Sequence, residues 1–587
     1  MTRNILIAFL RNDLRLTDHP IFSQFASSSS QRGLENVTHI LPVYVFDQQY
    51  IEVGGLNGIK KGKGPGGDQH GARTRVAGFW RTGKPRVQFM TRSVYDLQSR
   101  LQSIGSDLSI WSGHPHLILH KIVKALQKNG DNIHGVWYGE EPHTEEKATE
   151  KRIKKALAET QVPVRSFQHR SLILPKDLPF PLKDLPDVFT QFRKRVEAPD
   201  MYNDPLPAPE KLKPFPELPL IENEEGVYNV GKQAEQEVLQ QLLSPLEKDP
   251  GPIKPVKDDV NADKISALPF KGGETEALKR LEHYFTGDAN SHAANYKETR
   301  NGMLGVDYSS KFSAALAHGL LSPRTIAKRA EEVDKKSNSS GRGGGYWIIF
   351  ELLWRDYFFF VSEKYGSQLY TLKGIEESFD SKAAQEKAKS WNAPDSFENE
   401  KDPFVRWATA ETGVPLIDAN MKELALTGFM SNRGRQNVAS LLTKDLYYDW
   451  RLGAEWFESL LVDYDPSSNY GNWQYVAGVG NDPRASRQFN PIKQGKDYDR
   501  EAKYLKTWLP ALEQLSNNDA HHPWVSPSGS PDGYPAKPVC ESPAWKGHYG
   551  NNANRRGGIR GGGGGRSKRG GRGGGGQSNG QRRNNGN

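Results

Sequence analysis

The segment from Ser431 to Arg484 constrains this chain most, because it combines large aromatic rings with charged and amide side chains. Aromatic rings bring packing area and polar groups bring directed hydrogen bonds, and a large planar heteroaromatic cofactor needs both. The alternative is a tryptophan-rich helical core with solvated loops, but the order of the whole block favours a cofactor site. The residues concerned are Trp450, Trp456, Trp473, Asn432, Arg433, Arg435, Asp463, Asp465 and Asn469.

Two kinds of hydrophobic periodicity divide the chain. Short apolar runs expected as strands, at 4–10, 41–47, 107–113, 135–141 and 162–168, alternate with segments of helical spacing. This alternation predicts a doubly wound parallel α/β domain over residues 1–175. Helical periodicity dominates further along, which predicts an all-α domain over residues 266–515.

The remaining segments have biased compositions. Residues 176–265 are dense in Pro, Lys and Asp and predict an inter-domain connector that runs over the surface. Residues 52–88 are expected to be an insertion or mobile loop, and 337–345 a flexible loop. Residues 516–550 form a C-terminal extension, and the Gly/Arg/Asn-rich segment 551–587 is predicted to be disordered.

Cysteine content and the N-terminal sequence bear on the compartment. The single cysteine, Cys540, excludes internal disulfides and a cysteine-rich metal site, and fits a reducing compartment. The apolar run before Arg11 is too short for a signal peptide or a membrane span. We expect a soluble intracellular protein without a membrane partner; the sequence does not choose between nucleus, cytoplasm and an organelle.

The positive charge is concentrated at the C-terminal end. Residues 551–587 contain nine basic residues and no acidic one, which accounts for the whole formal net charge of +9. The rest of the chain is therefore neutral overall. Glycine-spaced arginines suit RNA or single-stranded DNA, through phosphate charge and arginine stacking. A solubilising or targeting extension is the alternative.

The motifs SNRGRQ and DYDPSSNYGNWQY, in the block described above, resemble the flavin-binding half of the photolyase/cryptochrome family, and within it the cryptochrome DASH branch. The resemblance covers roughly residues 1–515 and implies a helical FAD-binding domain. It implies that one set of residues holds the pyrophosphate and ribityl arm: Tyr296, Ser309, Ser310, Lys311 and Ser313. It further implies that Arg435 pairs with Asp463 beside the ring, that Asp463 and Asp465 face the ring and the sugar–adenine part, and that Asn469 lies against flavin N5.

The same resemblance implies a chain of tryptophans that carries electrons to the flavin. Trp473 corresponds to the member nearest the ring and Trp450 to the middle member. Trp391 is the preferred outer member, and Trp407 is the alternative. For any one of these tryptophans taken alone, a core residue is the simpler interpretation.

On the substrate side, Glu351, Trp354 and Arg355 share one helical face. The resemblance implies that Glu351 hydrogen-bonds a flipped pyrimidine dimer and that Trp354 stacks on it, whereas Arg355, or a Glu351–Arg355 pair, could be structural. Further contacts to the lesion or its phosphate are expected from Asn432, Arg433, Gln436 and Tyr475. Gln436 and Tyr475 stand where double-strand photolyases usually carry Met and Trp, so the cavity is more polar, which favours single-stranded lesions.

For the α/β domain, the resemblance implies an antenna chromophore, commonly 5,10-methenyltetrahydrofolate in this branch. Glu145 is the preferred carboxylate for it, and Glu141 is second. A solvated helix start is the simpler interpretation of these acidic residues.

The expected function is light-dependent repair of cyclobutane pyrimidine dimers by reduced FAD, in damaged and chiefly single-stranded DNA. This is the activity of a deoxyribodipyrimidine photo-lyase, here expected to act as a monomer without a metal. One alternative is a blue-light photoreceptor with little repair activity. Another is a regulator that binds RNA or single-stranded DNA through residues 551–587.

Overall fold

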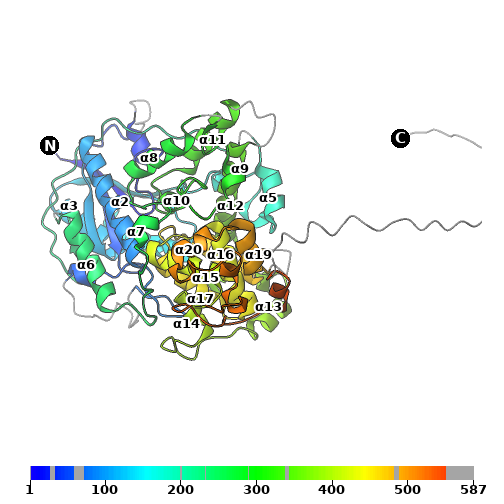
Figure 1. The fold of residues 1–587 in the computed structure, drawn as a ribbon. Helices are drawn as coiled ribbons and strands as arrows, with labels where there is room; N and C mark the ends of the chain where they lie inside the picture. Colours follow the sequence, from blue (N-terminus) through cyan, green and yellow to red (C-terminus); the bar gives the residue numbers. More distant parts are fainter. Residues whose placement is uncertain are drawn as a thin grey trace, which may run out of the picture. The chain divides into compact units, whose positions relative to one another are not determined.

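A computed structural model describes residues 2–26, 33–57, 72–198, 201–231, 233–287, 290–336, 343–481 and 488–549. The predicted disordered tail, 551–587, lies outside the described residues, as do 58–71 of the expected mobile loop and 337–342 of the flexible loop. Residues 1–549 form one compact unit (Figure 1). Among the described residues, no helix combines the length and the apolar composition needed to span a membrane.

A six-stranded sheet organises the N-terminal part, with strand order β5-β4-β1-β2-β3-β6. β1 to β5 are parallel, as predicted, and β6 pairs antiparallel with β3. The order runs outward from β1 in both directions, so the domain is doubly wound. The strands are β1 (Asn4–Leu10), β2 (His39–Asp47), β3 (Ser109–Gly113), β4 (Asn132–Gly139), β5 (Val164–Phe167) and β6 (Val227–Asn229).

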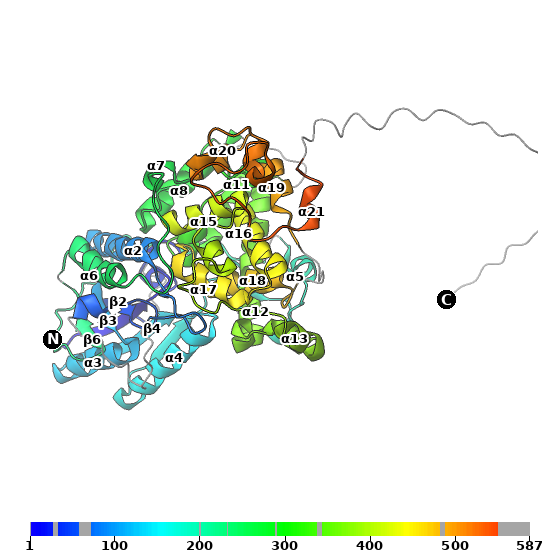
Figure 2. The same ribbon diagram turned by 60° about the horizontal axis from the view of Figure 1, so that its bottom comes forward.

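Alternate residues of β1 face different cores, which explains the continuous apolar run in its sequence. Ile5, Ile7 and Phe9 pack with α3 (Pro115–Lys128) and α4 (Thr144–Leu157). Leu6, Ala8 and Leu10 face α2 (Lys84–Ser103) and α6 (Glu235–Lys248), and belong to a core that continues into the helical domain. Figure 2 shows α2 and α6 on one face of the sheet and α3 and α4 on the other.

The helical domain follows α7 (Ala262–Ile265) and surrounds the long helix α12. Its helices are α8 (Glu274–Phe285), α9 (Tyr296–Thr299), α10 (Ser313–Ala317), α11 (Pro323–Lys336), α12 (Gly344–Tyr365), α13 (Ser381–Ala388), α14 (Pro403–Ala408), α15 (Pro415–Thr427), α16 (Asn432–Ser440), α17 (Trp450–Leu460), α18 (Pro466–Ala477), α19 (Pro491–Tyr498) and α20 (Lys503–Trp508). The C-terminal extension contains α21 (Pro543–Lys546), whose Trp545 is buried in the main core.

Three expectations about loops need correction. The connector contains α6, near the short helical patch expected at 232–245, but it also supplies β6 and α5 (Phe189–Val196), so it is part of both cores and not only a surface strap. The expected mobile loop 52–88 ends earlier, because α2 begins at Lys84. Gly344 and Gly345, expected in a flexible loop, open α12 and are buried. In each case a short apolar or glycine-rich segment packs against elements that are distant in sequence. The composition of the segment itself does not indicate those contacts.

Candidate functional site

One cavity of about 670 Å³ in the helical domain is lined by most of the residues singled out above. It lies among α9, α10, α12, α16, α17 and α18. Its lining includes Tyr296, Ser309, Ser310, Lys311, Ser313, Glu351, Trp354, Asn432, Arg433, Arg435, Gln436, Asp463, Asp465, Asn469, Trp473 and Tyr475. Trp391, Trp450 and Glu145 do not line it. Segments that are distant in sequence therefore converge on one site of cofactor size.

The loop that carries Ser309, Ser310 and Lys311 is held in shape from outside. Arg280 of α8 donates hydrogen bonds to the backbone carbonyls of Ser309 (3.0 Å) and Ser310 (3.0 Å). Lys311 has a left-handed backbone, with φ of 59°, and directly precedes the turn into α10. This conformation is unusual for a residue with a side chain and indicates a loop held by its surroundings.

Lys311 is a buried cation in an unusual environment. Its Nζ lies 3.2 Å from the centre of the Tyr308 ring, and no hydrogen-bond acceptor reaches it among the described residues. Burial lowers the pKa of Lys311 to about 7, although Glu423 opposes the shift. An anionic ligand would supply the missing partner.

Arg435 and Asp463 form the ion pair that the resemblance implies. Nη2 of Arg435 lies 2.7 Å from Oδ2 of Asp463, and Nε donates to the carbonyl of Met430. Oδ1 of Asp463 is buried and has no hydrogen-bond partner among the described residues. The pair therefore keeps an acceptor available at the cavity wall.

Asp465 and Asn469 belong to the start of α18. The carboxylate of Asp465 accepts from the backbone N–H of Ser468 and caps the helix. Burial opposes its ionisation, but His143, Arg170 and Arg355 hold the pKa of Asp465 below its usual value. Nδ2 of Asn469 donates to the carbonyl of Ala454 (2.9 Å), which orients the amide.

The residues present fit FAD. Lys311 Nζ, the Tyr308 hydroxyl and Asp463 Oδ1 are buried polar atoms without partners among the described residues, and such atoms normally have partners in proteins. A ligand that is anionic at one end and offers hydrogen-bond donors and acceptors at the other would satisfy them. The aromatic and aliphatic part of the wall, with Trp473 and Phe457, suits a planar ring system.

Trp473 and Trp450 lie on neighbouring helices that approach closely. A Cβ on Gly453 would meet the Trp473 ring at 2.2 Å, so only glycine allows α17 and α18 this contact. Trp450 lies one turn before Gly453 on α17 and is fully buried. Trp473 thus lines the cavity and also contacts the helix that carries Trp450.

The two candidates for the outer tryptophan have different environments. Trp407 is fully buried, donates to the carbonyl of Val438, and contacts the edge of Trp473 with ring centres 6.2 Å apart. Trp391 is partly exposed. The residue after it, Asn392, exchanges backbone hydrogen bonds with Tyr447 and Asp449, immediately before Trp450. Of the two, Trp391 has access to solvent, and its neighbour Asn392 is bound to the segment just before Trp450.

Glu351 pairs with an arginine that the sequence analysis missed. Its carboxylate accepts a hydrogen bond from Arg300, which follows α9. Burial in the cavity wall raises the pKa of Glu351, and Arg300 and Arg433 oppose that shift. Arg355, in contrast, donates to the backbone carbonyls of Arg170 and Leu316, so it has structural contacts.

The aromatic wall near Glu351 includes a residue of the connector. Phe189 stacks on Trp354 with ring centres 3.7 Å apart and planes within 12°. Tyr475 meets Trp354 edge-on at 6.0 Å. Arg433 donates to Gln436 Oε1 (2.8 Å), which gives this end of the cavity a polar margin. One face of Trp354 is therefore covered by protein.

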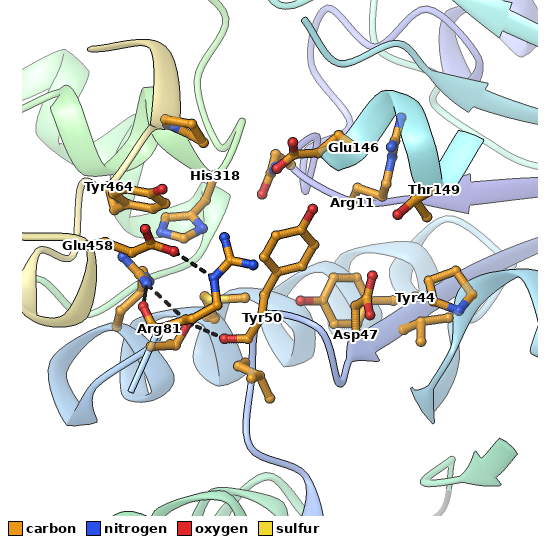
Figure 3. Close-up of a pocket in the computed structure, with 18 of the residues that line it drawn as sticks. Arg11, Tyr44, Asp47, Tyr50, Arg81, Glu146, Thr149, His318, Glu458 and Tyr464 are labelled. Carbon is orange, nitrogen blue, oxygen red and sulfur yellow. Dashed lines mark hydrogen bonds and ion pairs between the residues drawn. The ribbon is translucent and has the colours of Figure 1, made fainter. Parts of the chain in front are cut away.

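A second, smaller cavity of about 120 Å³ lies where the α/β domain meets the helical domain (Figure 3). Glu146 lines it, together with Tyr50, Asp47 and Arg81. Burial, and the nearby carboxylates of Glu141 and Glu145, raise the pKa of Glu146 to about 8. Arg81 points toward Glu458 in Figure 3, and its Nε lies 2.7 Å from the Glu458 carboxylate.

The two glutamates proposed for an antenna have other partners. Glu145 forms ion pairs with Arg75 and Arg81, each at 2.8 Å, and does not line the second cavity. Glu141 is buried near Arg170, at 3.5 Å. Glu146 was missed, although its place beside Glu145 in the pair Glu–Glu is a visible signal. Whether Glu145 or Glu146 reaches the cavity depends on the rotation of α4 against the sheet.

Together, an α/β domain, a helical domain and a flavin-sized cavity define a class of light-responsive flavoproteins. Residues 6–210 match the DNA photolyase family, and residues 347–544 match the FAD binding domain of DNA photolyase. The cryptochrome DASH of Danio rerio is 41% identical over 94% of this chain and 92% of its own length. That of Synechocystis sp. is 39% identical over 89% and 90%.

Solved structures agree with these sequence matches. The crystal structure of a Synechocystis sp. cryptochrome has a TM-score of 0.72 and 37% identity, and covers 90% of this chain and 93% of its own. A class III photolyase from Agrobacterium tumefaciens shares the fold, with a TM-score of 0.67 at 24% identity over 93% and 96%. The chain belongs to the photolyase/cryptochrome family, and its similar relatives are cryptochrome DASH proteins, as the sequence motifs indicate. The predicted fold class is confirmed, and the helical domain is an FAD-binding domain.

Proposed function

We propose that the protein repairs cyclobutane pyrimidine dimers in a light-dependent reaction and prefers single-stranded DNA. When bound, FAD would supply one electron to the dimer after excitation by blue or near-ultraviolet light. The electron would return to FAD after the ring splits. The observation that carries the proposal is that Glu351 and Trp354 line the same cavity as Lys311 and Asp463. A dimer held by the first pair would be in reach of a flavin held by the second.

On the flavin side, the protein binds and orients the cofactor. Lys311, Ser309 and Ser310 would hold the pyrophosphate, and the Arg435–Asp463 pair would lie beside the ring. Trp473, Trp450 and Trp391 would form the path that reduces oxidised flavin before repair. The partial exposure of Trp391 supports its place at the solvent end of that path.

On the substrate side, the protein selects the base. The Glu351 side chain can accept hydrogen bonds from the base imides as a carboxylate, or donate one to a base carbonyl as a neutral carboxylic acid. Its raised pKa favours the neutral acid. Trp354 lines the cavity and would stack on the base, and Phe189 packs against one face of its ring. Gln436 is bound to Arg433, so the pocket margin is polar and its apolar grip on an extruded dimer is weak. Extruding a base from a duplex costs a few kcal/mol, which single strands largely avoid.

We propose methenyltetrahydrofolate as the antenna, with its rings in the second cavity. Glu146, and not Glu145, is then the carboxylate that contacts it, because Glu146 lines the cavity whereas Glu145 does not and is bound to Arg75 and Arg81. Reconstitution with the folate should restore near-ultraviolet absorption in Glu145→Gln and fail in Glu146→Gln. If the near-ultraviolet absorption is lost in Glu145→Gln alone, Glu145 and not Glu146 contacts the folate.

One assay tests the repair function. Holoprotein with reduced FAD is illuminated with dimer-bearing oligonucleotides, single-stranded or duplex, and restored bases are counted by chromatography. We expect light-dependent repair that is faster on single strands, and none in the dark. Equal or faster repair of the duplex would contradict the strand preference. No repair of either substrate by a fully flavin-loaded protein would contradict the enzyme.

The second candidate is a photoreceptor or nucleic-acid-binding regulator, which the charge of residues 551–587 favours. Deleting these residues removes nine cations. Affinity for undamaged single-stranded DNA or RNA should fall, and the dependence of binding on salt should become weaker. Unchanged affinity and salt dependence would assign this binding to residues 1–550.

A further inference from the structure

Outside both cavities, two histidines and an aspartate place their ligand atoms together on the surface. His283 lies in the last turn of α8, His292 follows that helix, and Asp307 lies in the loop before Lys311. His283 Nε2 is 3.0 Å from Asp307 Oδ1, and His292 Nε2 is 3.5 Å from Asp307 Oδ2. All three ligand atoms lie within 4.8 Å of one another.

These separations suit a small divalent transition-metal ion. Zinc binds histidine nitrogen and carboxylate oxygen at about 2.0–2.2 Å in a tetrahedron, so its ligand atoms are roughly 3.3 Å apart. The two histidine–aspartate distances, 3.0 and 3.5 Å, are already close to that value, and the whole set of ligand atoms lies within 4.8 Å. Three protein ligands leave a fourth position for water, and the exposed side chains of His283 and His292 (54% and 44%) leave room for it. Nitrogen-rich ligands also favour zinc over magnesium or calcium.

Arg280 is the obvious argument against a cation here, because its Nη1 lies 2.6 Å from Asp307 Oδ1. The guanidinium approaches only one carboxylate oxygen, however, and Oδ2 faces His292. Carboxylates that bind metals commonly have such an outer partner, which orients the ligand. The other Arg280 nitrogens are bound to the carbonyls of Val306, Ser309 and Ser310. Arg280 therefore acts as a support for Asp307 and is not free to occupy the metal position.

The histidine rings also have supports of their own. The ring of His292 stacks on that of Tyr284, with centres 6.0 Å apart, and the two histidine rings lie 5.2 Å apart. Tyr284 is fully buried, so it offers His292 a fixed surface. Preset ligands lose little conformational entropy on metal binding, which favours affinity.

We propose that His283, His292 and Asp307 form a binding site for a zinc-like divalent ion. The ion would join α8 to the loop 306–311 at a point four residues before Lys311. Because that loop carries Ser309, Ser310 and Lys311, metal binding would slow the opening of the loop and the release of FAD. This consequence rests on the proposed FAD contacts of these three residues, whereas the metal site does not.

The test is zinc binding by tag-free holoprotein that has first been treated with a chelator. Zinc is titrated in competition with a chromophoric chelator, and bound metal is counted by mass spectrometry. We expect one equivalent in the wild type, and affinity at least tenfold weaker in His292→Ala and in Asp307→Asn. His120→Ala is the matched control, since His120 is a partly exposed histidine paired with Glu159 elsewhere on the surface. Substoichiometric zinc in the wild type, or equal affinity in all variants, would overturn the site.

Two further measurements separate folding and flavin effects from metal binding. Without zinc, the melting temperatures of the wild type, the variants and the control should agree. A variant with a lower melting temperature is replaced by His283→Gln. The rate of FAD release, followed by flavin fluorescence, should fall with zinc in the wild type only. An unchanged rate of FAD release in a zinc-loaded protein would overturn the coupling between the metal and the loop. A protein that does not hold FAD at all would count against the proposed FAD contacts and not against the metal site.

Discussion

The Arg435 guanidinium and the Asp463 carboxylate form a 2.7 Å ion pair on the wall of the large cavity, although Arg435 belongs to α16 and Asp463 to the turn between α17 and α18. The Asp463 side chain is 2% exposed and that of Arg435 is 28% exposed. The carboxylate is thus the buried partner, and the arginine is the charged group that pairs with it. An unpaired buried carboxylate would take up a proton or distort its surroundings.

Arg435→Ala should therefore weaken FAD binding by at least tenfold. Removing one partner of a buried pair typically costs about 3–5 kcal/mol, and the partial exposure of Arg435 reduces that figure here. FAD content from absorbance and affinity from fluorescence quenching measure the effect. Arg451→Ala is the control, because Arg451 pairs with Asp449 away from the cavity. Equal losses in both variants would assign the effect to general destabilisation.

FAD binding should become weaker as the pH rises above 7. Burial lowers the pKa of Lys311 to about 7 in the protein, so at pH 8 most of the amine is neutral. A nearby pyrophosphate favours the ammonium and raises that pKa, so binding at pH 8 should take up close to one proton. Calorimetry of FAD binding to flavin-stripped protein, in buffers of different ionisation heat, counts the proton. Lys311→Met should abolish the uptake and Lys279→Met should not; uptake that persists without Lys311 would contradict its role.

Photoreduction of oxidised FAD should stop in Trp473→Phe and in Trp391→Phe, because phenylalanine keeps much of the packing but is far harder to oxidise. Trp407→Phe should keep photoreduction and lose stability, since Trp407 is fully buried and hydrogen-bonded. Flavin absorbance under blue light with an external reductant, together with melting curves, distinguishes these outcomes. Photoreduction lost in Trp407→Phe but kept in Trp391→Phe would exchange their roles.

Glu351→Ala should lower the quantum yield of repair by about tenfold or more while FAD content and photoreduction stay normal, in line with the loss of one positioned proton donor or acceptor. Glu363→Ala is the control, because Glu363 is on the same helix but does not line the cavity. Repair is measured on single-stranded substrate with chemically reduced protein. Wild-type repair by Glu351→Ala would leave Glu351 with only a structural pairing to Arg300.

Much of the fold could be predicted because the signals are local. Each residue of β1 after Asn4 is apolar since the strand is buried on both faces, and this pattern is visible without any tertiary information. The cavity residues were found because they cluster in three sequence segments, 296–313, 351–355 and 432–475, whose motifs are dense in polar and aromatic side chains.

Long-range contacts were not predictable in the same way. Phe189 comes from a connector of polar composition, and only packing places it on Trp354. Arg300 is one of several charged residues near α9, and its role became visible when Glu351 was found beside it.

The sequence by itself determined the alternation of strands and helices in the α/β domain, the family, and the residues that carry the flavin motifs, because periodicity and motif spacing are properties of neighbouring positions. Tertiary structure decided which glutamate reaches the second cavity, which tryptophan is open to solvent, and that His283, His292 and Asp307 meet. The physical reason is that side-chain direction and burial depend on how whole elements rotate and pack against each other, and adjacent residues such as Glu145 and Glu146 point to different places on one helix.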